Sequence, residues 1–201
     1  MTTSRLEAFS DGVLAVIITI MVLELHVPEE PTLHALWHDT GPGLLTYLLS
    51  FVYIGIYWNN HHHMFQLAEH VNGAVLWANL ALLFVLSLYP FTTAWLDESI
   101  IEHGFDEHTP VVVYGVNLLA AAIAYYILQL AIFRAEGADS RLREAVGSDL
   151  KGKLSPGLYI LGIASAAWIH PLVGIAFFVA VAIIWLVPDR RLEQYVVQHS
   201  S

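Results

Sequence analysis

Beyond its first turn, the first apolar run of the chain carries a single hydroxyl-bearing side chain, Thr19. Placed on a helix, Gly12, Val16, Thr19 and Leu23 fall on one stripe at i, i+4, i+7 and i+11, with Ile20 alongside. Repeated around a symmetry axis, this stripe forms an apolar ring, a ring of hydroxyl groups and a second apolar ring. The alternative is structural: the threonine hydroxyl bonds to the carbonyl group four residues earlier and the helix packs against a neighbour.

Ionisable side chains lie at the start of the same run. An ionised side chain at the centre of a membrane span costs about 2.5–3.5 kcal/mol on insertion scales, so Asp11, about one turn inside the apolar run, needs a partner. Arg5 is the nearest cation. At i, i+6 the two residues do not share a helix face, so partners from other spans are expected. Alternatively, Ser10 and Asp11 cap the start of the helix.

A second apolar run carries polar residues at helical spacing, and such a face is expected to turn inward: Thr46, Ser50, Tyr53, Tyr57 and Asn60/His61. The run ends in "YWNNHHHMF". Consecutive histidines on a helix point about 100° apart, so His61, His62 and His63 cannot all bind one metal ion. A hydrogen-bond network with Arg5 and Asp11 is predicted. Zinc or haem ligation and solvated interfacial histidines are the alternatives.

In the third run, "WANLALLFVLSLYPFTTAW", Asn79 is expected to bond across helices and Pro90 to kink the span near its outer end. The fourth run is rich in glycine and alanine, which favours close helix packing over a substrate pocket.

Composition indicates that lipid surrounds these helices. Of 201 residues, 57% are hydrophobic and 13% are charged, and the mean hydropathy is +0.60. The eight Lys and Arg residues are too few for a nucleic-acid partner, and the absence of Cys excludes disulfides and thiolate chemistry. The sequence therefore predicts an all-α integral membrane protein.

A bilayer core about 30 Å thick needs roughly 20 helical residues. Six apolar runs approach this length, over residues 9–25, 43–61, 74–96, 111–133, 157–170 and 172–187. The last two are short and meet at His170-Pro171, which is either a tight turn or the kink of one long span. Two spans are favoured, because Pro171 suits the first turn of a new helix.

The cations predict the orientation of the spans. With six spans and the N-terminus inside, every Lys and Arg falls on the cytoplasmic side, and the outer segments "HVPEEPTLHALWHDTGPG" and "DESIIEHGFDEH" contain acids and His alone as ionisable groups. We therefore expect one membrane domain over residues 1–190 and a cytoplasmic tail over 191–201, with both termini in the cytoplasm. No TVGYG loop, voltage-sensor Arg/Lys pattern, nucleotide loop or Ser/His/Asp nucleophile signature is present, which argues against an ATP-driven pump and against an enzyme.

The motif R-x-x-x-F-S-D at Arg5, Phe9, Ser10 and Asp11, leading into a threonine-bearing first span, resembles the signature of the lysosomal potassium channel family, transmembrane protein 175, in its prokaryotic single-repeat form. The resemblance extends to "YWNNHHHMF" and "NLALLFVLSLYPF". It implies a homotetramer in the prokaryotic plasma membrane, with a central pore that has no carbonyl filter and is lined by four copies of the first helix. Animal members of the family carry two six-span repeats per chain.

The resemblance also implies roles for single residues. The apolar constriction of the family falls on Val16 and Leu23, with Ile20 beside them, and its threonine layer falls on Thr19. Val16 departs from the Ile or Leu that relatives often carry. The implied structural network consists of the signature residues and their partners: Arg5, Phe9, Ser10, Asp11, His61, His62 and Asn79. Potassium ions, lipid and further copies of the chain are the implied partners, with no cofactor and no metal beyond potassium passing Thr19.

Three other functions are compatible with the sequence. A proton- or cation-coupled transporter could use Asp11 and the histidine cluster as a relay. A membrane metal or haem protein could be built on His61 to His63. A purely structural membrane scaffold would carry no flux.

Overall fold

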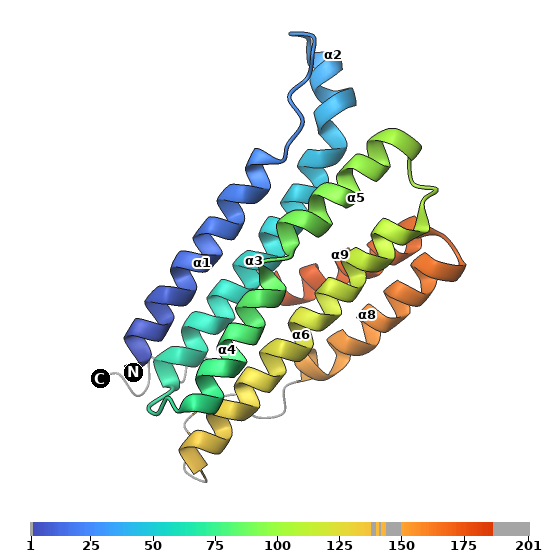
Figure 1. Cartoon of the computed structure of the whole chain (residues 1–201). Helices are drawn as coiled ribbons and strands as arrows, with labels where there is room; N and C mark the ends of the chain where they lie inside the picture. Colours follow the sequence, from blue (N-terminus) through green and yellow to red (C-terminus); the bar gives the residue numbers. More distant parts are fainter. Residues whose placement is uncertain (1, 138–139, 141, 144–149, 187–201) are drawn as a thin grey trace.

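The chain forms an all-helical bundle, seen in the computed structural model of Figure 1. The structure describes residues 2–137, 140, 142–143 and 150–186. The predicted all-α fold class is confirmed for these residues, and the predicted tail of residues 191–201 lies outside them. In chain order the helices are α1 (Thr3–Leu23), α2 (Leu33–Ala35), a π-helical segment η1 (Leu36–Thr40), α3 (Gly41–Leu67), α4 (Gly73–Leu86), α5 (Tyr89–His103), α6 (His108–Glu136), α8 (Leu150–Trp168) and α9 (Pro171–Leu186).

Among the described residues, four segments are long and apolar enough to cross a membrane: α1, residues 33–67, residues 73–103 and α6. The last apolar helix, α9, is shorter at 16 residues. The favoured break at His170-Pro171 is confirmed, because α8 ends at Trp168 and Pro171 begins α9. The two helices touch closely: a Cβ atom added to Gly174 would lie 2.8 Å from the carbonyl oxygen of Gly162.

The predicted kink at Pro90 divides the third run into two helices, within a segment that extends beyond the predicted 74–96 to His103. α4 ends at Leu86 and α5 begins at Tyr89, with Pro90 in its first turn. Proline has no N–H group, and its ring clashes with the carbonyl group four residues earlier, which here belongs to Leu86. Helix α4 therefore ends before the proline. Because α5 continues to His103, Pro90 lies in the middle of the segment and not near its end, where the sequence had placed it.

The helices also extend into segments that were expected to be loops. Residues 97–103 belong to α5, which ends at His103 and is followed by Gly104 with a positive φ of 69°. Residues 33–40 form α2 and η1. α3 runs on to Leu67 and includes all three histidines. The reason is that charged and polar residues continue a helix as long as no breaker intervenes, so apolar length underestimates helix length.

The polar face of the second run turns inward, as predicted. Thr46, Ser50, Tyr53, Tyr57 and His61 are all buried. The Ser50 hydroxyl lies 2.7 Å from the Thr93 hydroxyl and 3.0 Å from the Tyr114 hydroxyl, and the Tyr53 hydroxyl donates to the carbonyl oxygen of Phe178 at 2.6 Å. Lipid cannot satisfy these groups, so α3 meets its partners on α5, α6 and α9 inside the bundle.

Helix α6 packs against α4, α5, α8 and α9, whereas α1 packs on α3, α4 and α5. Close packing of α6 is confirmed at Gly115, where an added Cβ atom would clash with the ring of Phe178. In Figure 1 α1 stands at one edge of the bundle and α8 at the other. The N-terminus, the α3–α4 connection and the end of α6 share one end of the molecule, opposite the α5–α6 connection.

Candidate pore-lining surface and the contacts that hold it

The outward side of α1 carries the predicted pore residues. Val16, Thr19, Ile20 and Leu23, here called the α1 stripe, are all exposed in the single chain, with Val16 at 55%, Ile20 at 41% and Leu23 at 81%. The whole helix is the least buried of the membrane-length segments. Only 28% of its most apolar window is buried, against 44% in each of the other three. None of the described helices of the same chain therefore covers the α1 stripe.

Within the α1 stripe, the Thr19 hydroxyl donates to the carbonyl oxygen of Val16 at 2.9 Å. The expected acceptor four residues earlier is wrong, because this side chain reaches the carbonyl group three residues earlier, which a helical threonine also allows. Packing against a neighbouring helix of the same chain is not observed either, since Thr19 is exposed. The hydroxyl proton is used within the helix, and the oxygen lone pairs stay available as acceptors.

The opposite side of α1 is buried, and a series of hydrogen-bonded polar side chains ties it to the neighbouring helices. The Nδ2 of Asn79 on α4 donates to the Ser10 hydroxyl at 2.9 Å, and Nε2 of His61 on α3 lies 2.8 Å from Oδ1 of Asn79. Ser10 in turn donates to the carbonyl oxygen of Leu6 at 2.9 Å. The three side chains are 0%, 0% and 1% exposed for Ser10, Asn79 and His61. This Ser10–Asn79–His61 chain includes the bond across helices predicted for Asn79 and ties α1 to two neighbours.

Two further contacts join α1 to α3. Nε1 of Trp58 donates to Oδ1 of Asp11 at 3.1 Å, and Nδ1 of His62 lies 2.6 Å from Oε1 of Glu7. The other ring nitrogen of His62 lies 2.8 Å from Nε2 of Gln66. The Trp58 and His62 rings stack with an interplanar angle of 13°. Asp11 thus receives a partner from another helix and does not pair with Arg5.

Glu7 and Trp58 were not identified from the sequence. The signal that could have found them is a pair of matching spacings: Glu7 and Asp11 are at i, i+4 on α1, and Trp58 and His62 are at i, i+4 on α3. Residues at this spacing lie on one helix face, so two acceptors on one helix can meet two donors on the next.

Two predicted residues lie apart from these contacts in the single chain. Arg5 is exposed and forms no ion pair with a described residue. Phe9 is 50% exposed and lines a hollow with Val16 and Pro90. Their place in the structural network stays a prediction.

The three consecutive histidines reach three different partners, because successive side chains of a helix point about 100° apart. His61 meets Asn79, His62 meets Glu7, and Nδ1 of His63 lies 2.8 Å from the carbonyl oxygen of Asn59. The arrangement tethers helices and does not converge on a common point.

The fold and these contacts define a helical membrane protein. Its first helix carries the apolar, hydroxyl-bearing α1 stripe on the outer surface of the single chain. The family model described as "Endosomal/lysosomal potassium channel TMEM175" matches residues 5–90. A potassium channel of Chryseobacterium sp. (strain P1-3) is 52% identical over 96% of this chain and 97% of its own length. A potassium channel of Chamaesiphon minutus is 32% identical over 89% of this chain and 92% of its own length.

A solved structure agrees with these sequence matches. The crystal structure of a lysosomal potassium-selective channel TMEM175 homolog from Chamaesiphon minutus superposes with a TM-score of 0.74 at 30% identity, covering 92% of this chain and 96% of that one. The chain belongs to the TMEM175 family, whose members are ion channels and not enzymes. The resemblance inferred from R-x-x-x-F-S-D is confirmed.

Proposed function

We propose that four copies of this chain assemble around a central axis, and that their α1 helices line a potassium-selective pore without a carbonyl filter. The observation that carries the proposal is the α1 stripe. It is exposed and bears a hydroxyl group at membrane depth, in a chain whose α3 polar face is buried and paired. The potassium-channel relatives support the choice of ion.

The α1 stripe supplies two physical elements of such a pore. Rings of Val16 and Leu23 form apolar constrictions, which block ions by dewetting when they are narrower than a hydrated ion. Between them, a ring of Thr19 oxygens replaces part of the hydration shell of a weakly hydrated cation. Potassium gives up its water more readily than sodium, so the hydroxyl ring favours potassium.

The charges at the two ends of the helical bundle suit a cation channel with cytoplasmic termini in the prokaryotic plasma membrane. Beyond the end of α1, a hollow is lined by four acids: Glu24, Asp97, Glu98 and Glu102. An acidic outer entrance raises the local cation concentration. The end of α6, which carries Arg134, and the start of α8, which carries Lys151 and Lys153, lie toward the opposite end of the bundle (Figure 1), in agreement with the cytoplasmic bias of Lys and Arg. In this arrangement the α8–α9 hairpin supplies the fifth and sixth spans.

The signature residues have a structural role in this proposal. The Ser10–Asn79–His61 chain and the Asp11–Trp58 and Glu7–His62 contacts set the rotation of α1, so that the α1 stripe faces the axis. Arg5 and Phe9 are exposed in the single chain and contact neighbouring copies in the tetramer.

Single-channel recording of the purified protein in a potassium gradient tests the proposal. Thr19→Ala is expected to lower the selectivity for potassium over sodium while leaving a tetramer, because only the hydroxyl ring is lost. Ser87→Ala is the matched control: Ser87 is also exposed and also donates to the carbonyl group three residues earlier, at 2.7 Å, but lies outside the α1 stripe. It should leave the reversal potential unchanged.

Two results would contradict the proposal. Unchanged reversal potentials in Thr19→Ala would remove the hydroxyl groups from ion selection. Saturable flux that depends steeply on pH, in place of ohmic currents, would favour a coupled transporter that uses Asp11 and the histidine cluster.

A further inference from the structure

The hollow beyond the end of α1, here called the acidic hollow, lies against the C-terminal half of α5. Its volume is about 320 Å³, at the lower end of the usual range of small-molecule sites. Among the described residues, no Lys or Arg lines it. Four of the side chains that line it are acids: Glu24, Asp97, Glu98 and Glu102. The acidic hollow is therefore suited to a positively charged ligand.

Asp97 is the buried acid of this hollow. It is 7% exposed, whereas the other three acids are exposed. Its carboxylate packs on α3 at Gly43, where an added Cβ atom would clash with it. Oδ1 of Asp97 has no hydrogen-bond partner among the described residues. A buried carboxylate without a partner costs free energy, which a bound cation recovers.

Two of the exposed acids have a defined spacing. Glu98 and Glu102 are one helical turn apart on α5, about 6 Å along its axis. Glu102 has one loose ion pair, 3.9 Å from Nδ1 of His103, and the two side chains are 60% and 54% exposed. Such a pair between exposed groups contributes little. Both carboxylates therefore remain available to a ligand.

The arrangement of the acids favours an organic cation over a metal ion. Among the described residues, no group of three His, Asp or Glu side chains could hold a metal ion. Ca²⁺ needs about six to eight oxygen ligands at roughly 2.3–2.6 Å. A molecule with separate ammonium groups instead meets the carboxylates one at a time. Ala94 and Ile101 also line the hollow and offer apolar surface to a hydrocarbon chain between such groups.

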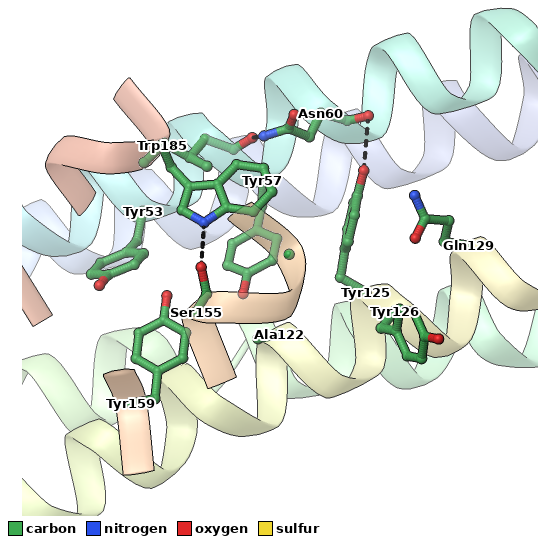
Figure 2. A pocket seen from close by; sticks show the side chains of 12 residues that line it. Tyr53, Tyr57, Asn60, Ala122, Tyr125, Tyr126, Gln129, Ser155, Tyr159 and Trp185 are labelled. Carbon is green, nitrogen blue, oxygen red and sulfur yellow. Dashed lines mark hydrogen bonds between the residues drawn. The ribbon is translucent and has the colours of Figure 1, made fainter. Parts of the chain in front are cut away.

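The hollow in Figure 2 has the opposite character. It lies between α3, α6, α8 and α9, and tyrosines of three of these helices line it together with Trp185. Among the described residues that line it, none is acidic, and its volume is about 50 Å³. An organic cation finds neither an opposite charge nor sufficient room there.

We propose that the acidic hollow binds linear diamines, with one ammonium group at Glu98 and the other at Glu102. An extended four-carbon diamine holds its nitrogen atoms roughly 6 Å apart, because its bonds are about 1.5 Å long. This separation matches one turn of α5. Asp97 and Glu24 add negative charge to the same hollow. The site lies within the outer entrance of the proposed channel, but its occupation requires no conduction.

Equilibrium dialysis of the purified protein with putrescine, a four-carbon diamine, tests the site. The protein is held in nanodiscs of zwitterionic lipid in about 0.15 M KCl, which screens unspecific attraction, and empty nanodiscs are the blank. The matched analogue butylamine lacks the second ammonium group. The wild-type protein is expected to bind putrescine saturably and about tenfold more tightly than butylamine, because a second charge-assisted hydrogen bond forms.

Variants locate the binding. Glu98→Gln/Glu102→Gln should lose the preference for putrescine, since glutamine keeps the shape and removes both charges. Asp106→Asn/Glu107→Gln is the matched control. It removes two charges from the exposed α5–α6 connection, where the Glu107 side chain forms no capping bond, and should leave the preference unchanged. Asp97→Asn should weaken the binding of both amines several-fold.

If Asp97→Asn does not elute as the wild type does, the Glu98→Gln/Glu102→Gln variant decides alone. Absence of saturable binding, equal affinity for the two amines, or equal loss in the two double variants would each overturn the proposal. Tighter binding of Mg²⁺ than of putrescine, measured by displacement, would assign the hollow to a metal ion and overturn it too. None of these readouts requires ion flux, so failure of the site is distinct from failure of the proposed channel function.

Discussion

Helices α1 and α3 differ in whether their polar side chains are buried within the chain. α3 buries its polar face, and Ser50, Tyr53 and His61 each meet a partner on another helix of the chain. α1 buries only Ser10 among its membrane-depth hydroxyl groups and leaves Thr19 exposed, between the exposed side chains of Val16 and Leu23. Both helices are apolar enough to cross a membrane, so hydropathy does not separate them.

The difference shows which helix finds partners for its polar groups within a single chain. Polar groups in lipid find partners inside the protein or line water. α3 has its partners already and therefore acts as the scaffold of the single chain. The exposed Thr19 hydroxyl donates its hydrogen bond to Val16 of its own helix, and the lone pairs of its oxygen can accept from water or contact an ion. That asymmetry is the basis for placing α1, and not α3, at the axis of the proposed tetramer.

The largest effect is expected where the two helices are joined. Asn79→Leu removes the bonds to both Ser10 and His61 and leaves the buried Nε2 of His61 without a partner. We expect a loss of about 2 kcal/mol in stability and a lower yield of tetramer. Thermal unfolding followed by size-exclusion chromatography measures both quantities.

Asn117→Leu is the matched control for this variant. Asn117 is also a buried asparagine, but its one bond, to the Thr92 hydroxyl, is 3.2 Å long and its Oδ1 has no partner among the described residues. Its replacement should cost clearly less than that of Asn79. Equal losses in the two variants would mean that Asn79 acts through packing and not by tying α1 to α3.

A functional effect with little structural cost is expected at the C-terminal end of the α1 stripe. Leu23→Ala removes a side chain that is 81% exposed, so the stability of the single chain should change by less than about 0.5 kcal/mol. If Leu23 forms an apolar constriction, the resting potassium current rises several-fold. Val22→Ala, at a neighbouring position of the same helix that is 43% exposed, is the control. An unaltered current in Leu23→Ala would exclude this residue from the gate.

The smallest effect is expected at Asp11. Among the described residues, its one side-chain hydrogen bond is with Nε1 of Trp58, and the amide oxygen of asparagine can accept the same bond. Asp11→Asn should therefore assemble as the wild type does, whereas Asp11→Ala should reduce the tetramer yield. Equal damage by both variants would reveal a need for the negative charge, as in an ion pair between Asp11 and Arg5 of a neighbouring copy.

The sequence predicted some of these contacts and missed others for definable reasons. The inward face of α3 was predictable, because Ser50, Tyr53 and His61 recur at helical spacing in an apolar run. The Glu7–His62 contact was not, because residue 7 precedes the apolar run and was not assigned to a helix. The proline at position 90 predicted a bend, but hydropathy could not show that the helix beyond it continues through charged residues to His103.

By itself, the sequence determined the class of protein, the approximate position of each apolar helix, the polar face of α3 and the family signature. These properties depend on composition and on the 3.6-residue repeat, which are local. The tertiary structure alone decided that Trp58 meets Asp11, that the Thr19 hydroxyl bonds to Val16, and that tyrosines of three helices line one hollow. Such contacts depend on the relative rotation and depth of packed helices, and no repeat within a single helix contains that information.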